Sequence, residues 1–408
     1  MDPRVKPEGG GLSGFSICAI HAACGPPQVV KTSSQPKLLF LVTEDWYFCS
    51  HRLPVARAAR DAGFAVAVAT RVRDHGDAIR AEGFALHPLG WRRRGGGIAG
   101  HLRALMEIVR LYQSEKPDIV YHVALKPVLF GGLAVRLAFP AGGRPALISA
   151  VMGLGASAAA RWKRRMLGVA LRFAAAGGAI IVQNPEDREA LIGFGLDRAR
   201  IALIRGSGVD TEHFAPLPEL AGTPVMVAFV GRMLKSKGVL TAVSAVRALR
   251  AGGVEVGLIL AGAPDPDSSD SLSEPEMREL AREPGIEWLG YVADVREVWS
   301  RAHIAVLPST YGEGVPKSLL EAAACARPII ASDMPGCREV VVSRETGILI
   351  PQLDATRLAA VIQIFATDPA LRRRLGEAGR ARVRAEFADA IIADATLALC
   401  QAELERRR

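Results

Sequence analysis

The chain has 408 residues, of which 50% are hydrophobic, 23% charged and 6% aromatic, and its formal net charge is +9. This length exceeds one typical domain and suits two of roughly 200 residues. The six cysteines lack paired spacing, which argues against a zinc site and a disulfide framework and favours a reducing cytosol. Because aromatic residues are sparse and no nucleic-acid motif is recognisable, nucleic acid is not an expected partner.

The positive charge is concentrated in one part of the first half. Residues 91–172 hold fourteen Lys and Arg against three acids, or +11, so the remaining 37 basic and 39 acidic residues carry −2. A phosphate-bearing lipid is the favoured partner of this region. The most apolar stretches, 146–160 and 166–182, are shorter than the about 20 residues of a membrane span. We therefore expect a peripheral protein at most.

Short apolar runs alternate with helical stretches from residue 37 onward, the pattern of βαβ units. The preceding residues, 1–35, are rich in Gly, Pro and Ser and lack a secretory signal, and they are predicted to be a disordered tail or an overextended start. Strands are predicted at 37–43, 64–70, 84–88, 119–122, 146–150 and 179–183, and helices at 52–62, 98–112 and 127–138. After a Pro-rich linker at 216–224, further strands are predicted at 225–230, 254–261, 287–290, 304–307, 328–331 and 347–350, and helices from 355 to the end.

These elements predict an α/β fold of two Rossmann-like domains, 36–215 and 216–386, whose parallel sheets face a cleft. We expect the last helix, 387–408, to return to the first domain.

The stretch 309–321 combines a Gly-rich turn with a helix start. Pro316 suits the first position of a helix, so the helix is predicted to begin near Val315 or Pro316. Its free N–H groups would lie next to Glu313 and form a candidate site for a diphosphate. The alternative is an ordinary capped helix with a Glu on its surface.

A second carboxylate, Glu321, falls about five residues inside this helix, roughly 7 Å along its axis. The pair Glu313 and Glu321 therefore suits the sugar and ribose ends of a nucleotide sugar. Arg232 and Lys237 follow another predicted strand and could bind a diphosphate between them, as a fork and a point charge. Alternatively, both cations are solvated surface residues.

These motifs resemble the C-terminal half of glycosyltransferase family 4, which comprises retaining enzymes of the GT-B fold. The resemblance rests on Gly231-Arg232, Lys237-Gly238, the Glu-x7-Glu stretch from Glu313 to Glu321, and the run from Arg327 to Gly336. It implies that Arg232 and Lys237 bind the donor diphosphate, Glu321 the ribose, the backbone at Val292 the nucleobase, and Glu313 with Gly314, Val315, Pro316 and Lys317 the transferred sugar. It also implies that Arg232, Lys237 and Glu313 act in catalysis. His122 is implied to face the donor sugar and to act in catalysis as well, although a lone His after a strand is often structural.

Motifs of the first domain resemble a narrower branch, the bacterial N-acetylgalactosaminyltransferases that extend undecaprenyl-diphosphate-linked sugars. They are Thr43 to Pro54, Tyr121 to Pro127, Gln183 to Asp187 and Gly206 to Asp210. One departure is Phe48-Cys49, where many members of the family have Gly-Gly, so Ser50 or His51 is expected to line the cleft instead. The lipid-phosphate acceptor is expected to meet Lys126, Arg161, Lys163, Arg164 and Arg165, although the last four could also form a solvated helix face.

The resemblance implies transfer of a hexose or N-acetylhexosamine from a UDP-sugar to an undecaprenyl-diphosphate-linked saccharide, with retention, at the cytoplasmic face of the inner membrane. No cofactor or metal is expected, because cations and a helix dipole would balance the charge of the leaving UDP. Rival possibilities are a GT-B sugar-nucleotide epimerase, a phosphorylase, a glycosyltransferase with a soluble acceptor and a non-catalytic scaffold.

Overall fold

The structure is a computed structural model that describes residues 35–91, 97–140, 142–154, 161–219, 222, 224–310, 312 and 314–407, with only the backbone of residue 161. The chain divides into two units, Met1–Gln35 and Pro36–Arg408. The helices and strands belong to the second unit, and the tail predicted at 1–35 lies outside the described residues except for Gln35.

The first sheet contains seven parallel strands in the order β3-β2-β1-β4-β5-β6-β7. They are β1 (Lys37–Glu44), β2 (Ala65–Arg71), β3 (Ala85–Pro88), β4 (Ile119–Val123), β5 (Ala146–Ala150), β6 (Ala179–Val182) and β7 (Ile201–Leu203). The strand order reverses between β1 and β4, so loops leaving these neighbours diverge and open a crevice at the carboxyl edge.

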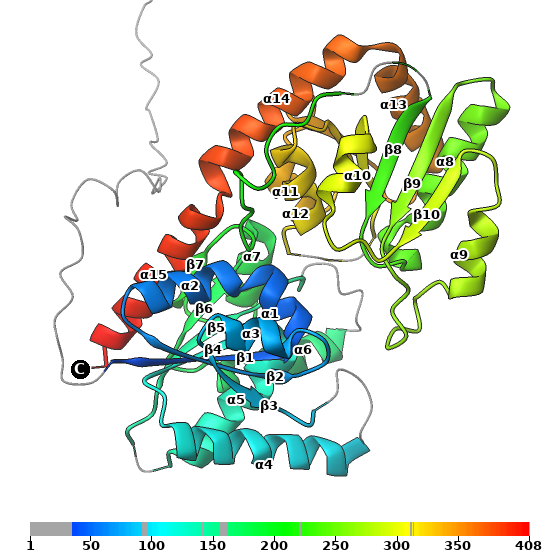
Figure 1. Ribbon diagram of the computed structural model, residues 1–408. Coiled ribbons are helices and arrows are strands. Elements are labelled where there is room, and N and C mark those ends of the chain that lie inside the picture. Colours follow the sequence, from blue (N-terminus) through cyan, green and yellow to red (C-terminus); the bar gives the residue numbers. More distant parts are fainter. Residues whose placement is uncertain are drawn as a thin grey trace, which may run out of the picture. The chain divides into compact units, whose positions relative to one another are not determined.

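Helices cover both faces of this sheet (Figure 1). They are α1 (Asp45–His51), α2 (Leu53–Asp61), α3 (Gly76–Ala81), α4 (Gly97–Glu115), α5 (Leu125–Ala138), α6 (Arg161–Ala174) and α7 (Pro185–Gly193), followed by the 3-10 turn η2 (Arg198–Arg200). Leu38 and Phe40 of β1 point to the face of α1, α2 and α3, whereas Leu39 and Leu41 point to that of α4 and α5. This alternation is the period-2 pattern of a strand buried on both sides.

The second sheet contains six parallel strands in the order β10-β9-β8-β11-β12-β13. They are β8 (Val225–Val230), β9 (Val256–Ala261), β10 (Ile286–Gly290), β11 (Ile304–Leu307), β12 (Ile329–Ser332) and β13 (Gly347–Ile350). Its elements share one hydrophobic core, and its order reverses between β8 and β11. A second crevice therefore opens after these two strands.

The helices of this half are α8 (Val239–Ala251), α9 (Glu274–Leu280), α10 (Arg296–Arg301), α11 (Lys317–Ala324), α12 (Pro335–Val340), α13 (Ala355–Thr367), α14 (Pro369–Glu386) and α15 (Asp389–Glu405), with the 3-10 turn η3 (Lys235–Lys237) before α8. Helix α15 returns to the first sheet, as predicted, and packs on α2 (Figure 1). Its Ile392, Ala393 and Cys400 belong to the core on that side.

The chain crosses between the two halves twice, and the crossings are hydrogen-bonded to each other. The N–H of Val209 donates to the carbonyl of Phe387 at 3.0 Å, and the N–H of Asp389 donates to the carbonyl of Val209 at 3.0 Å. Gly206 and Gly208 flank this junction with φ of 79° and 84°, a conformation that favours glycine.

Two details differ from the sequence analysis. Strand β7 was not among the predicted strands, because its three residues give no readable alternation. Helix α11 begins at Lys317, and Pro316 occupies the N-cap with ψ of 120°, one position before the predicted site. Proline fixes only φ, so the extended ψ is compatible with the residue. Glu321 is nevertheless the fifth helical residue, as predicted.

Candidate functional site

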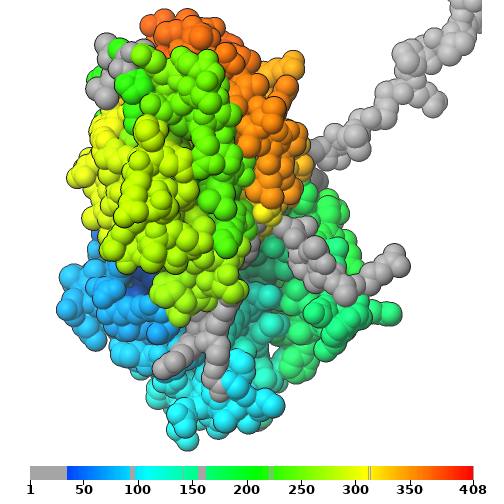
Figure 2. Space-filling view, turned by 90° about the vertical axis from the view of Figure 1, so that its right-hand side faces the viewer, coloured from blue at the N-terminus to red at the C-terminus, as the bar shows by residue number. Residues whose placement is uncertain are grey.

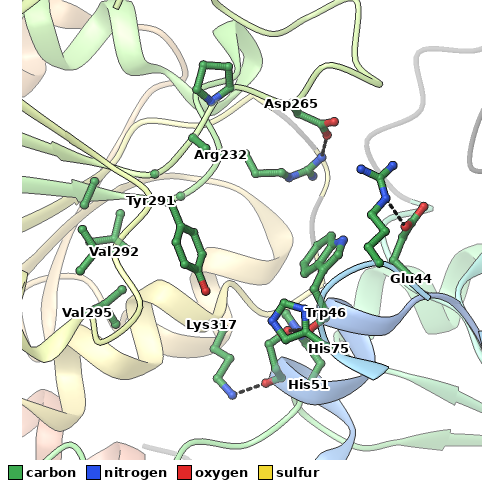
Figure 3. Close-up of a pocket in the computed structure, with 18 of the residues that line it drawn as sticks. Glu44, Trp46, His51, His75, Arg232, Asp265, Tyr291, Val292, Val295 and Lys317 are labelled. Carbon is green, nitrogen blue, oxygen red and sulfur yellow. Dashed lines mark hydrogen bonds and ion pairs between the residues drawn. The ribbon is translucent and has the colours of Figure 1, made fainter. Parts of the chain in front are cut away.

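A pocket of about 460 Å³ lies between the carboxyl edges of the two sheets (Figure 3). Its lining combines residues at or after the ends of β1 and β2 with residues that follow β8, β9 and β10 and two residues of α11. The principal lining side chains are Glu44, Trp46, Ser50, His51, Arg73 and His75 from the first half, and Arg232, Asp265, Asp267, Tyr291, Val292, Lys317 and Glu321 from the second. The pocket therefore occupies the place where open α/β sheets bind ligands.

Arg232 follows β8 and is held by a carboxylate. Its Nη1 donates to Oδ2 of the buried Asp265 at 2.6 Å (Figure 3). Beside it, Gly262 packs directly on the Gly231 backbone, because a Cβ on Gly262 would lie 1.8 Å from the carbonyl oxygen of Gly231. The ion pair fixes the direction of a guanidinium that carries five N–H donors. Arg232 thus lines the pocket with its guanidinium held by Asp265.

Glu321 and Lys317 lie one helical turn apart on α11. Burial raises the pKa of the Glu321 carboxyl to about 7, against the opposing effect of the Lys317 ammonium. The Nζ of Lys317 donates to the carbonyl of Ser50 in α1 (Figure 3). The first turn of α11 therefore contacts the first half of the molecule through Lys317, and its second turn carries a carboxylate that titrates near neutral pH.

The Gly-rich turn before α11 also contacts the first half. The N–H of Val315 donates to Oε1 of Gln183, just beyond β6, at 2.9 Å. A Cβ on Gly314 would lie 1.8 Å from the same oxygen. Gln183 thus satisfies one backbone donor of the turn that the sequence analysis assigned to the transferred sugar.

Two of the predicted first-domain residues, Ser50 and His51, line the pocket. The Ser50 hydroxyl donates to the carbonyl of Trp46 at 2.8 Å and lies 2.6 Å from His51 Nδ1, and the His51 ring stacks on Tyr47 with centroids 4.1 Å apart. Burial, followed by the charges of Lys317, Arg52 and Lys237, lowers the pKa of His51 well below its ordinary value. The ring is therefore neutral at physiological pH.

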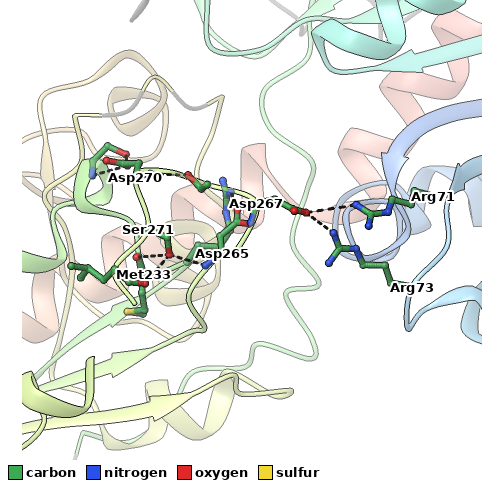
Figure 4. A network of polar contacts seen from close by, with 11 residues as sticks. Arg71, Arg73, Met233, Asp265, Asp267, Asp270 and Ser271 are labelled. Carbon is green, nitrogen blue, oxygen red and sulfur yellow. Dashed lines mark hydrogen bonds and ion pairs between the residues drawn. The ribbon is translucent and has the colours of Figure 1, made fainter. Parts of the chain in front are cut away.

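Ion pairs connect the two halves at the rim of the pocket (Figure 4). Arg73 Nη2 lies 2.5 Å from Asp267 Oδ2, and Arg71 Nη1 lies 3.6 Å from the same oxygen. On the other side, both guanidiniums lie within 3.4–3.6 Å of the buried Glu44 carboxylate. The two arginines thus join a carboxylate of each half.

His122 does not line this pocket, and its side chain is fully buried. Its Nε2 lies 2.9 Å from the Tyr112 hydroxyl, and Gly131 of α5 leaves the space that the ring fills. Burial lowers the pKa of His122 to about 3. The expectation that it faces the donor sugar disagrees with this position, because residue 122 of β4 points into the helix layer rather than out of the carboxyl edge.

The remaining predicted residues lie at different places. Gly314 and Pro316 line a small hollow beside α12, and Glu313 is outside the described residues. Lys237 is not among the lining residues but lies close enough to lower the pKa of His51. The Nζ of Lys126 lies over the rings of Trp91 and Phe130, at 5.5 and 5.8 Å from their centroids.

The predicted basic cluster lies on α6, away from the pocket lining. Arg164 and Arg165 line a separate surface hollow, the Nζ of Lys163 lies 5.5 Å from the Trp162 ring, and the side chain of Arg161 is not described.

Several lining residues were missed by the sequence analysis, namely Glu44, Trp46, Arg73, His75, Asp265, Asp267 and Tyr291. All lie at or just after the carboxyl ends of β1, β2, β9 or β10, and this position was the signal that could have identified them. Within the described residues, no group of three or more His, Cys, Asp or Glu is arranged to hold a metal ion. No helix in the same part of the chain is long and apolar enough to cross a membrane.

Two family models match the chain. Residues 37–184 match the glycosyl transferase 4-like model, and residues 211–382 match the model of glycosyl transferases group 1. Each match covers less than half of the chain, and each contains most of the strands of one sheet.

Individual relatives include, by name, a synthase of a sugar phosphate and a glycosyltransferase of polysaccharide biosynthesis. The chain is 38% identical to alpha-maltose-1-phosphate synthase of Mycobacterium tuberculosis over 50% of its own length and 57% of that protein. It is 25% identical to the capsular polysaccharide biosynthesis glycosyltransferase CapM of Staphylococcus aureus, over 71% of the chain and 78% of the relative. The alignment thus spans little more than half of the first of these relatives.

The fold has close counterparts among solved structures. Anabaena HepE in complex with UDP-glucose matches with a TM-score of 0.71 at 18% identity, covering 89% of this chain and 99% of that one. At this identity the likeness concerns the fold alone. It confirms the predicted GT-B arrangement of two Rossmann-like domains.

Proposed function

We propose that this chain, whose two halves match glycosyltransferase family models, transfers a hexose or N-acetylhexosamine from a UDP-sugar to an undecaprenyl-diphosphate-linked saccharide. The observation that carries the proposal is the convergence of Arg232, Lys317 and Glu321 on one pocket at the carboxyl edges of both sheets. The named ligand of the HepE structure supports a nucleotide-sugar donor, and the name of CapM supports a role in polysaccharide synthesis.

In this proposal the donor lies along the edge of the second sheet. The backbone at Val292 meets the nucleobase, the ionised Glu321 accepts hydrogen bonds from the ribose, and Arg232 with Lys237 binds the diphosphate. The transferred sugar lies at the turn of Glu313 and Gly314, where it would displace Gln183 from the N–H of Val315. Developing charge on UDP is stabilised by the cations and by the N-terminus of α11, without a metal.

The transfer proceeds with retention on one face of the sugar. The bond from the anomeric carbon to the UDP oxygen breaks, the acceptor hydroxyl oxygen bonds to the same face of that carbon, and the leaving phosphate takes the hydroxyl proton. The acceptor enters beside Ser50 and His51, which line the opposite side of the pocket. Its lipid keeps the enzyme peripheral at the cytoplasmic face of the inner membrane. Closure of the two halves excludes water.

Release of UDP from candidate UDP-sugars, measured with and without an undecaprenyl-diphosphate monosaccharide, tests this function. We expect UDP release and a lengthened glycan only when the acceptor is present. Conversion of the UDP-sugar without an acceptor would indicate an epimerase, dependence on free phosphate a phosphorylase, and transfer to a water-soluble sugar alone a soluble acceptor. Absence of turnover with every donor would favour a non-catalytic scaffold.

A further inference from the structure

Helix α6 carries an apolar stripe that is more than half exposed, and among the described residues the Arg136 guanidinium of α5 contacts it, 4.2 Å from the centroid of the Phe173 ring. Trp162, Met166, Val169 and Phe173 have exposed fractions of 61%, 63%, 53% and 54%. At about 100° per residue these positions fall within about 60° of one another around the helix axis. Large apolar side chains on four successive turns of one helix form a continuous strip, and such a strip marks a surface that meets another apolar phase.

Cations flank this stripe on both sides. Lys163 lies about 90° to one side of its centre, whereas Arg165 and Arg172 lie about 70–90° to the other, at the same 100° per residue. All three side chains are exposed, and α6 contains no acidic residue. A narrow apolar stripe between cations is typical of a helix that lies in the plane of an anionic membrane surface, with Trp at the level of the headgroups.

A hollow on one side of the stripe strengthens this inference. It has a volume of about 550 Å³, and Arg164, Arg165 and Arg172 line it together with Gly168, Val169 and residues 193–195. No acidic residue is among these described lining residues. At the floor of the hollow, Gly168 of α6 packs closely on Phe194, because a Cβ on Gly168 would lie 2.9 Å from the Phe194 ring. Three guanidiniums around one hollow suit a phosphate group.

We propose that α6 is an interfacial helix whose apolar stripe enters the outer part of a bilayer leaflet while the hollow of Arg164, Arg165 and Arg172 binds the phosphate of an anionic phospholipid. This inference deepens the membrane partner of the proposed function and adds Arg172 and the stripe to the residues concerned. The hollow and the pocket between the sheets have no lining residue in common. Binding of the phospholipid therefore does not require the sugar reaction.

Binding of the full chain to phosphatidylcholine vesicles, with and without phosphatidylglycerol, tests the proposal by co-sedimentation in the absence of any sugar nucleotide or acceptor. We expect binding only to vesicles that contain phosphatidylglycerol. Trp162→Ser combined with Phe173→Ser should weaken binding about tenfold or more, and so should Arg165→Gln combined with Arg172→Gln. The control Arg373→Gln with Arg374→Gln removes two exposed charges from α14 and should change binding less than about twofold.

The proposal is overturned if the wild type does not bind, binds both vesicles equally, or loses binding equally in the α14 control. Retention of binding in both α6 variants overturns it as well. A dimer that dissociates in the Trp162/Phe173 variant while vesicle binding persists would assign the stripe to a second copy of the chain. Binding to anionic vesicles that inorganic phosphate abolishes at constant ionic strength, without any effect of the stripe variant, would assign the hollow to free phosphate. Thermal unfolding of each variant checks that the fold is retained.

Discussion

The two halves of the molecule share a doubly wound architecture, but they differ in the side chains that they present at the surface and in the pocket. In the second half the ligand-facing groups come from short turns after strands, and ion pairs such as Arg232–Asp265 hold them. In the first half, His122 at the end of β4 is buried, and α4 and α6 leave apolar side chains such as Ile98 and Trp162 exposed. The second half thus holds its pocket-lining Arg232 by an ion pair, whereas the first half exposes large apolar side chains on α4 and α6; Figure 2 shows the face of the molecule that carries α4, in cyan.

The largest expected effect concerns Arg232, whose substitution tests whether the second half binds the donor. Arg232→Ala should lower kcat/KM by about 100-fold to 1,000-fold, because it removes a charge-assisted contact to the negative charge that develops on the leaving diphosphate. Steady-state UDP release measures this loss, and Arg374→Ala, an exposed position on α14, serves as the control. Turnover of the Arg232 variant within threefold of wild type would refute the assignment of the donor site to the second half. Lys237→Ala should give a loss of the same kind.

A substitution of His122 tests the first half of the molecule. The predicted catalytic role and the buried position of this residue lead to opposite expectations for its effect on kcat. From the structure we expect His122→Ala to lower the free energy of unfolding by about 2–4 kcal/mol, because it leaves a cavity and removes the partner of the Tyr112 hydroxyl. Denaturant unfolding measures this effect. The kcat of the folded variant should stay within about tenfold of wild type, and a larger loss would restore His122 to the active site.

The pH dependence of donor binding tests the proposed role of Glu321. The pKa of about 7 means that the carboxylate form rises from roughly a tenth at pH 6 to roughly nine-tenths at pH 8. The KM for the donor should therefore fall about tenfold over this range if the ionised carboxylate binds the ribose. Glu321→Gln should remove most of this dependence.

Asp389 is a second group that titrates in this range, since burial raises its pKa to about 6. For both carboxyls the folded-state pKa is raised, so their contribution to stability is present below about pH 4 and is lost as the pH rises through 6 to 7. Donor binding should thus improve with pH while these two groups cease to stabilise the fold. A donor KM that stays constant from pH 6 to pH 8 in the wild type would refute the ribose contact.

The smallest expected effect concerns metal ions. Because cations and the α11 N-terminus are proposed to stabilise the leaving UDP, EDTA should change the initial rate of transfer by less than about twofold. The same assay repeated with added Mg²⁺ or Mn²⁺ provides the control. A rate that collapses in EDTA and recovers with a divalent cation would contradict the charge balance proposed for the second half.

The sequence predicted most of the fold because long apolar strands and amphipathic helices give strong periodic signals. It missed β7, whose three residues give none, and placed Pro316 one position too far into the helix. For the site, sequence patterns placed Arg232 and Glu321 in the pocket lining because both belong to local motifs. They did not predict the Arg232–Asp265 ion pair or the contact of Gln183 with Val315, because these partners lie 33 and 132 residues apart in the chain.

The return of α15 has a consequence for how the molecule is made. Ile392, Ala393 and Cys400 complete a core whose other members come mostly from residues 38–204, so the first half is discontinuous in the chain. During synthesis its sheet can form early, but one of its faces stays unfinished until Asp389–Glu405 of α15 has left the ribosome. The core of the second half, in contrast, is made of residues that end at Phe387. The later half can therefore finish folding before the earlier one.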